Sequence, residues 1–168
     1  MAEANPTFGL RPMLPEDGPA LAEIYRESIA ELTGDDYDPA QQEAWAASAD
    51  DEEAFTDELA GQLTLVAVFR QSPVGFASLD GNERIAMLFV HPAVARQGIA
   101  TMLVDALEKL AAGRGAARLT TEASDTARPF FAGRGYVAER RETVIRVGEW
   151  LGRTVMAKQL GDDRGAGA

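Results

Sequence analysis

Cysteine is absent from this chain of 168 residues, and histidine occurs only once, as His91. Without cysteine the chain cannot form a disulfide, use a thiolate as nucleophile or bind zinc through thiolates. A single imidazole also excludes a metal site built from several histidines. We therefore expect no metal among the functional groups of this protein.

Long apolar runs are absent too. No segment approaches the roughly 18 consecutive apolar residues that suggest a membrane-spanning helix. Residues 1–5 lack the basic start and the apolar run of a signal peptide. These absences predict a cytoplasmic protein that makes no contact with a membrane.

Positive charge is scarce in the first third of the chain. Residues 1–60 hold 16 Asp and Glu but only two Arg, whereas residues 61–168 hold 11 acidic and 14 basic side chains. The net charge of −11 argues against nucleic-acid binding, which normally uses a basic surface. The acidic segment, with the loop at residues 34–38 at its centre, either forms an entrance for a cationic substrate or provides solvated helix faces.

Hydrophobic periodicity predicts a single α+β domain, which the chain length also favours. Proline, glycine and Asp-Gly-Asn signals divide the sequence into segments. Strands are expected at residues 8–13, 63–69, 74–79, 84–90, 118–122, 137–147 and 150–160. Helices are expected between Pro15 and Gly34 and at residues 39–49, 52–59, 99–113 and 127–135. Because residues 161–168 are small and polar, we expect a disordered tail after a domain at residues 1–160.

The segment after the fourth expected strand carries the clearest functional signal. Residues 95–101 read Ala-Arg-Gln-Gly-Ile-Ala-Thr and lead into an apolar helix. The first N–H groups of a helix lack intrahelical partners and attract anions, and Gly98 has no side chain to hold a phosphate away. The segment indicates a phosphate-bearing ligand; a plain polar turn is the alternative. Neither the P-loop pattern nor the dinucleotide fingerprint is present.

Three segments resemble the GNAT superfamily of acyl-CoA-dependent N-acyltransferases: residues 84–92 (RIAMLFVHP), 96–100 (RQGIA) and 127–136 (ARPFFAGRGY). The resemblance covers residues 8–160, and a bacterial, largely uncharacterised subgroup is similar at residues 37–41, 44–46 and 120–124. It implies a mixed, mostly antiparallel central sheet of about seven strands flanked by helices. It also implies that an acetyl group passes from acetyl-CoA to a primary amine of a small molecule or protein.

The same resemblance assigns the residues that contact CoA. In the family the loop before the helix holds the pyrophosphate, and the bulged strand before the loop pairs with pantetheine. Carried over, the loop contacts come from Arg96, Gln97, Gly98, Ile99, Ala100 and Thr101. The strand contacts come from Leu88, Phe89 and Val90. The Val90 amide would polarise the thioester carbonyl. The family's loop pattern begins with Gln or Arg, where this chain has Ala95.

Two further positions adjoin the thiol in the family. Ser124 stands where many members have an asparagine near the pantetheine; its alternative role is to cap the helix that follows. Phe131 stands where many members have the tyrosine that protonates the departing thiolate, and phenylalanine cannot donate a proton. This substitution motivates a second hypothesis, a CoA-binding sensor or protein-interaction module with weak or no activity. Under both hypotheses, the enzyme and the sensor, the sequence leaves open whether the protein forms a homodimer.

The acid and base of the reaction are not evident from the resemblance. The carboxylate that the family often has on the fourth strand has no counterpart, since Ala86 occupies the middle of that strand. Glu122 is a candidate base or a solvated carboxylate, and Tyr37 is a candidate acid or a residue that shapes the acceptor pocket. His91 is an imidazole able to transfer protons near neutral pH, but its place at a strand end favours a structural role. Without cysteine, or a serine beside a base, we expect direct transfer in a ternary complex.

Overall fold

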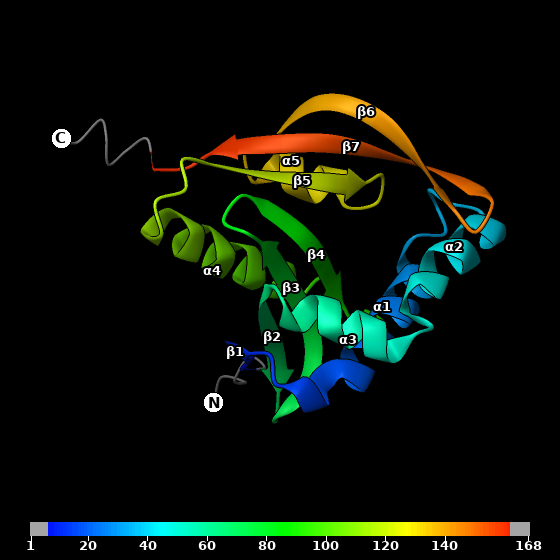
Figure 1. The fold of residues 1–168 in the computed structure, drawn as a ribbon, viewed down its shortest axis with the longest axis horizontal. Helices are drawn as coiled ribbons and strands as arrows, with labels where there is room; N and C mark the ends of the chain where they lie inside the picture. Colours follow the sequence, from blue (N-terminus) through cyan, green and yellow to red (C-terminus); the bar gives the residue numbers. More distant parts are fainter. Residues whose placement is uncertain (1–6, 162–168) are drawn as a thin grey trace, which may run out of the picture.

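The fold is built around one seven-stranded sheet, shown in Figure 1; the computed structural model describes residues 7–161. The strand order is β1-β2-β3-β4-β5-β7-β6, and neighbouring strands are antiparallel except β4 and β5, which are parallel. The expected α+β class and mostly antiparallel sheet are thereby confirmed. The strands are β1 (Gly9–Pro12), β2 (Leu63–Phe69), β3 (Ser72–Asp80), β4 (Arg84–Val90), β5 (Arg118–Ser124), β6 (Val137–Arg146) and β7 (Glu149–Gln159).

The helices lie where the sequence predicted them. Within the described residues they are α1 (Gly18–Leu32), α2 (Pro39–Ala46), α3 (Glu52–Ala60), α4 (Ile99–Gly113) and α5 (Arg128–Gly133). Asp38 begins α2 as expected: its side chain accepts a hydrogen bond from the Gln41 amide, and the Gln41 side chain accepts one from the Asp38 amide. This helix ends before residue 49 because residues 47–49 form a 3-10 turn. Of the tail expected to be disordered, residues 162–168 lie outside the described part.

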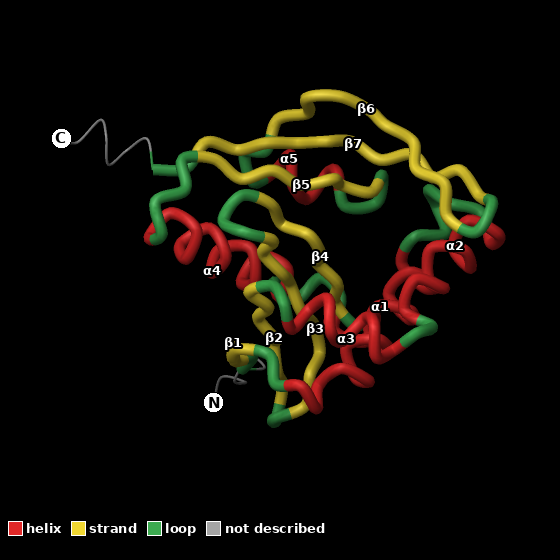
Figure 2. The backbone as a smooth tube through the Cα atoms, viewed as in Figure 1, coloured by secondary structure: helices red, strands yellow, loops and turns green. Residues whose placement is uncertain are grey.

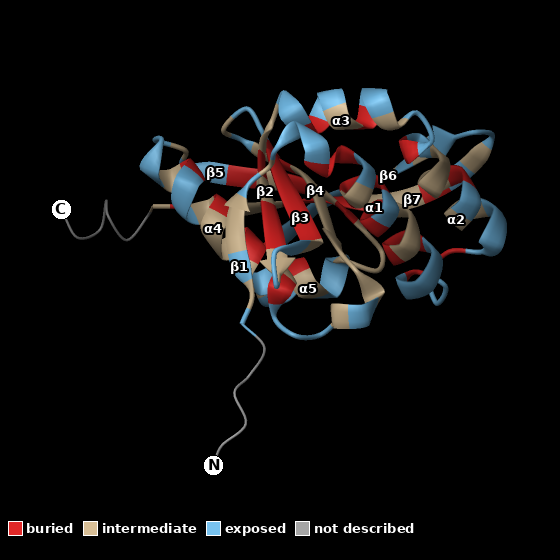
Figure 3. Ribbon diagram, turned by 90° about the horizontal axis from the view of Figure 1, so that it is seen from below, coloured by how far each residue is buried: buried red, intermediate tan, exposed pale blue. Residues whose placement is uncertain are grey.

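Two apolar clusters cover the two faces of the sheet. On one face, α1 and α3 pack against β2 and β3 through side chains such as Leu21, Leu59 and Phe76. On the other face, Leu103 and Leu107 of α4 pack against the sheet. Figure 3 shows the resulting buried bands on β2 and β3. The central strands are therefore apolar on both sides, as the runs at residues 63–69 and 74–79 indicated.

The turn between β2 and β3 is shorter than expected. The strands expected at residues 63–69 and 74–79 leave residues 70–73 for it, but Arg70 and Gln71 reverse the chain with φ angles of 50° and 72°, and β3 begins at Ser72. Two left-handed residues in succession give the tight hairpin turn that matches the twist of antiparallel strands. Pro73 consequently lies inside β3, beside a register shift that accommodates its missing N–H.

The separation of β4 from β5 positions the functional site. The two strands pair only at Arg84 with Thr120 and at Ile85 with Thr121, whose Oγ1 also donates to the Ile85 carbonyl at 3.0 Å. Beyond this point they diverge, as Figure 2 shows, and β5 continues to pair with β7. The edge of β4 that faces β5 therefore has no strand partner in the described chain after Ile85.

A bulge in β4 accompanies this separation. β3 pairs with Ile85 and then skips Ala86, so that Ala86 is the extra residue. The bulge shifts the alternation of the side chains: Ile85, Leu88 and Val90 pack on the α4 side, whereas Phe89 packs on the side of α1 and α3. Because a bulge bends and twists its strand, it accounts for the divergence of β4 from β5.

A buried carboxylate connects β1 to the start of α1. Asp17 is 6% exposed and accepts hydrogen bonds from the Arg11 guanidinium at 2.7 and 2.9 Å. It also accepts one from the Leu14 amide at 2.8 Å. The bond with Arg11 is the main reason why the pKa of Asp17 lies below its ordinary value of 3.8; burial acts in the opposite direction.

We expect Asp17→Asn to lower the free energy of unfolding at neutral pH by about 1.5 to 3 kcal/mol. The ionised carboxylate contributes fully above the unfolded-state pKa near 3.8, and its contribution is lost as the pH falls through the lower folded-state pKa. Urea unfolding at a series of pH values should show the two proteins converging in acid. Asp57→Asn, at an exposed position of α3, is the control and should change little. A stability difference that is constant down to acid pH would contradict this account.

Candidate active site

A cleft of about 490 Å³ opens where β4 and β5 separate. One wall comes from the α1–α3 side, the other from the β6–β7 hairpin, and its floor from β4 and β5. The cleft brings together six of the residues selected from the sequence: Tyr37, Leu88, Phe89, Glu122, Ser124 and Phe131. They come from four separate segments of the chain, and only the fold places them side by side.

The segment predicted to bind phosphate lies beyond the cleft, at the far end of β4. Val90 ends that strand, and residues 96–101 lead into α4; neither lines the cleft. Arg96 and Gly98 have φ angles of 64° and 85°. A Cβ on Gly98 would meet no described atom within 4 Å, so the space before the helix is open. No side chain in residues 7–161 caps this helix, which leaves its first amides available to an anion.

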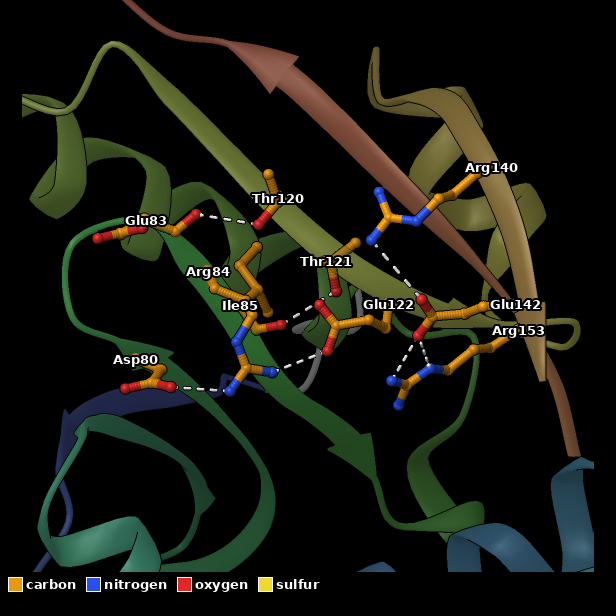
Figure 4. A network of polar contacts seen from close by, with 10 residues as sticks. All are labelled: Asp80, Glu83, Arg84, Ile85, Thr120, Thr121, Glu122, Arg140, Glu142 and Arg153. Atoms are coloured by element: carbon orange, nitrogen blue, oxygen red, sulfur yellow. Dashed lines mark hydrogen bonds and ion pairs between the residues drawn. The ribbon is translucent and has the colours of Figure 1, made fainter. Parts of the chain in front are cut away.

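Glu122 lies where the two strands part, as Figure 4 shows. Its Oε1 accepts a hydrogen bond from Arg84 at 2.8 Å, and Arg84 also donates to Asp80 at 2.8 Å. Burial lowers the pKa of Arg84, but its bonds to the two carboxylates outweigh this effect and the net shift is upward. The Glu122 side chain is 21% exposed, so it is a partly buried, ion-paired carboxylate and not a freely solvated one.

Tyr37 is fixed in the cleft wall through its hydroxyl. This group donates to the Gly152 carbonyl at 2.7 Å and accepts from the Asp125 amide at 2.9 Å. Burial raises the pKa of the phenol, and its ring packs edge-on against Trp45. These contacts join the loop after α1 to β7 and to the end of β5. The geometry therefore agrees with the pocket-shaping alternative for Tyr37.

Ser124 and His91 take part in local turns. Ser124 Oγ accepts a hydrogen bond from the Ala127 amide at 3.1 Å, and the residue also lines the cleft. The capping role and a role beside a ligand are thus compatible. His91 Nδ1 accepts from the Ala93 amide at 3.0 Å, and its Nε2 lies against Glu27 of α1. Both ring nitrogens are engaged, which fits the structural role expected for His91.

At Phe131 the cleft has a phenyl ring in place of the phenol that the sequence resemblance implies for this position. The side chain is 2% exposed and packs edge-on against Phe130 and Tyr136. The hydroxyl of Tyr136 donates to Glu108 at 2.9 Å, and burial together with this carboxylate raises its pKa far above the ordinary value. Tyr136 does not line the cleft, so it does not substitute for the missing donor.

Six polar residues of the cleft were not selected from the sequence: Tyr25, Glu58, Arg84, Thr121, Arg146 and Arg153. Tyr25 follows the apolar periodicity of its helix, so nothing in the sequence marks it as a site residue, and it is 5% exposed. The two hairpin arginines follow the strand alternation of β6 and β7, which is visible in the sequence. That alternation does not reveal which face of the hairpin covers a cleft, because the sequence contains no information on what lies opposite.

Membrane-spanning helices and clusters of metal-binding side chains are both absent from the described residues. None of the helices in residues 7–161 combines the length and apolar character that a membrane crossing requires. The same residues contain no group of three or more acidic or histidine side chains arranged as potential metal ligands.

Known proteins are similar to this chain in sequence and in fold. A family model for the acetyltransferase (GNAT) domain matches residues 33–160. The uncharacterized N-acetyltransferase YafP of Escherichia coli K12 is 33% identical over 142 residues, 84% of this chain and 89% of YafP. A crystal structure from Rhodopseudomonas palustris, described as "GCN5-Related N-acetyltransferase: Aminotransferase, Class-II", is 54% identical, with a TM-score of 0.90 over 95% of this chain and 99% of that one.

The fold extends to more distant proteins. The PaiA N-acetyltransferase from Thermoplasma acidophilum, solved in complex with coenzyme A, is 19% identical. Its TM-score is 0.75, over 91% of this chain and 99% of that chain. The family match, together with the 33% identity to YafP, shows that this chain belongs to the GNAT family and is an acetyltransferase.

Proposed function

We propose that this acetyltransferase transfers an acetyl group from acetyl-CoA directly to a primary amine within a ternary complex. The observation that carries the proposal is the unpaired edge of β4, which leads from the cleft to the open N-terminus of α4. PaiA, which shares the fold, binds coenzyme A in its own structure. The absence of cysteine rules out a thioester intermediate on the enzyme.

The backbone of β4 is suited to hold pantetheine. The His91 amide donates to the Val74 carbonyl of β3 at 2.8 Å. Since successive amides of a strand point to opposite sides, the Leu88 and Val90 amides are directed away from β3, toward the unpaired edge. We expect pantetheine to pair along this edge and the Val90 amide to polarise the thioester carbonyl. The residues at 96–101 would then hold the pyrophosphate, as their place at the end of β4 suggests.

Transfer requires the amine to lose a proton and the departing sulfur to gain one. We assign the base role to Glu122, because its carboxylate lines the cleft where the strands part and Arg84 fixes its position. Tyr37 could act as the acid only after giving up its bond to Gly152, so we assign it to the wall of the acceptor pocket. With Phe131 at the usual tyrosine position, positioning of the reactants has to supply much of the rate.

The finer part of the proposal concerns the amine end of the acceptor, which is cationic before it loses its proton. The acidic loop at residues 34–38 borders the cleft through Tyr37, whereas Asp35 and Asp36 do not line it. Asp36 instead accepts a hydrogen bond from Thr126 at 2.8 Å. Attraction of a cation by this loop would therefore act over a distance and would weaken with salt. A cytoplasmic location, the absence of nucleic-acid binding and a homodimer remain predictions from the sequence.

Gly98→Glu should weaken CoA binding by at least about tenfold, or 1.4 kcal/mol, since it places a carboxylate before the helix where the pyrophosphate would bind. Calorimetric titration with CoA is the measurement. Gly115→Glu is a matched control, because Gly115 also has a positive φ, of 92°, and open surroundings but lies after the C-terminal end of α4. Equal affinities of the two variants would refute the phosphate assignment.

Glu122→Gln should lower kcat by about a hundredfold or more, the usual contribution of a general base, and leave CoA affinity unchanged. Glu142→Gln serves as the control, since Glu142 is also paired with an arginine, Arg153, but does not line the cleft. Rates of acetyl-CoA consumption with a panel of primary amines provide the measurement. If Glu122→Gln keeps the wild-type kcat, another group is the base; if the wild type binds CoA and acetylates no amine, the sensor hypothesis is favoured.

Phe131→Tyr should leave the turnover number nearly unchanged or raise it, because the enzyme already works without a phenol at this position. Phe131→Ala should lower stability by about 3 to 5 kcal/mol through lost packing. Turnover across a pH series, with melting curves of both variants, checks these expectations. A large loss of activity in a Tyr variant that melts normally would show that the position has another role.

A further inference from the structure

The inner face of the β6–β7 hairpin forms one wall of the cleft, and the hairpin tip lies beside α2 in Figures 1 and 2. Residues that pair across antiparallel strands share a face. Three such pairs follow one another on one face of the hairpin: Glu142 with Arg153, Val144 with Leu151, and Arg146 with Glu149. Four of these six residues line the cleft, which identifies their face as the inner one.

Arg146 differs from the other arginines of the cleft in its lack of an acidic partner. Arg84 bonds to two carboxylates, and Arg153 donates to Glu142 at 2.6 Å, as Figure 4 shows. Arg146 forms no ion pair with any residue in the described part of the chain, although Glu149 lies opposite it in register. A guanidinium that lines a cleft and has no carboxylate partner is a ready site for an anion.

A second polar group of the cleft is the hydroxyl of Tyr25. Tyr25 of α1 lines the same cleft, and its hydroxyl makes a long hydrogen bond of 3.4 Å to the Trp45 carbonyl. Burial is the main cause of its raised pKa; the charge of Arg146 lowers that pKa and the charge of Glu58 raises it. The hydroxyl is therefore protonated at neutral pH and can donate a hydrogen bond to a ligand in the cleft.

We propose that the acceptor is a linear primary amine with a carboxylate at its other end, and that Arg146 binds this carboxylate. The inference rests on the proposed amine transfer. Glu122 of β5 and Arg140 of β6 both pair with Val155 of β7, so the three residues lie in one row across the sheet. Arg146 lies six residues further along β6, a distance of about 20 Å at roughly 3.3 Å per residue. The Glu122 and Arg146 side chains span only part of this distance. An extended ω-amino acid therefore fits better than an α-amino acid.

The test compares ω-amino acids of increasing chain length with the corresponding ω-amino amides, which have the same size but no negative charge. For the longer chains the wild type should prefer the acid by about tenfold or more in kcat/KM, as expected for a charge-assisted bond. Glycine and its amide should show no such difference. Arg146→Gln should bring the ratio for long chains close to one and leave the KM for acetyl-CoA unchanged.

Two control variants separate this effect from general changes of charge. Arg114→Gln removes the same charge at an exposed position after α4 and should keep the preference. Glu58→Gln removes an acidic side chain that lines the cleft and should also keep the preference. The inference is overturned if Arg114→Gln loses the preference for acids as fully as Arg146→Gln does. It is also overturned if the wild type acetylates the amides without preferring the acids. Either result leaves the proposed amine transfer intact.

If neither acids nor amides are acetylated, no ratio of rates can be measured, and binding decides the role of Arg146. Long ω-amino acids would then be titrated into the CoA-bound wild type and into CoA-bound Arg146→Gln. Affinity that falls about tenfold or more with Arg146→Gln supports the anion site. Equal affinity for the two proteins, or no binding to either, overturns it.

Discussion

The bulge at Ala86 turns β4 away from β5 after only two paired positions, and most of the functional geometry follows from this divergence. Within residues 7–161 it leaves one edge of β4 without a strand partner in an otherwise continuous sheet. Buried backbone amides must find hydrogen-bond partners, so an unpaired edge inside a protein is stable only if water or a ligand satisfies it. The cleft, the outward Val90 amide and the open start of α4 lie along this edge.

The arginines of the cleft differ in the number of carboxylates that hold them, and this number falls towards the hairpin tip. Nearest the divergence, Arg84 is held by two carboxylates, and on the hairpin Arg153 is held by one. Paired charges of this kind keep their positions. Towards the hairpin tip the pairing ends at Arg146. The cleft thus combines a centre whose charged side chains are fixed by ion pairs with one end where a ligand can supply the missing partner.

Local patterns were sufficient for much of this structure. Apolar runs and proline or glycine signals located the helices and strands, and the family resemblance implied the bulged strand and its loop. The β2–β3 turn was placed wrongly because Arg70 and Gln71 are not residues that usually adopt positive φ. Arg146 and Tyr25 were missed for another reason: their access to the cleft depends on strand register and on the packing of distant segments, which no local pattern records.

The Tyr37 hydroxyl joins parts of the chain that are 115 and 88 residues apart, at Gly152 and Asp125. The two halves of the site are consequently completed at different times during synthesis. The strand and loop assigned to CoA are finished by residue 101, whereas the wall around the acceptor has to wait for the last hairpin, β6–β7. Contacts that span so much of the chain are costly to close and form late in folding. Recognition of the acceptor is therefore the property that is acquired last as the chain folds.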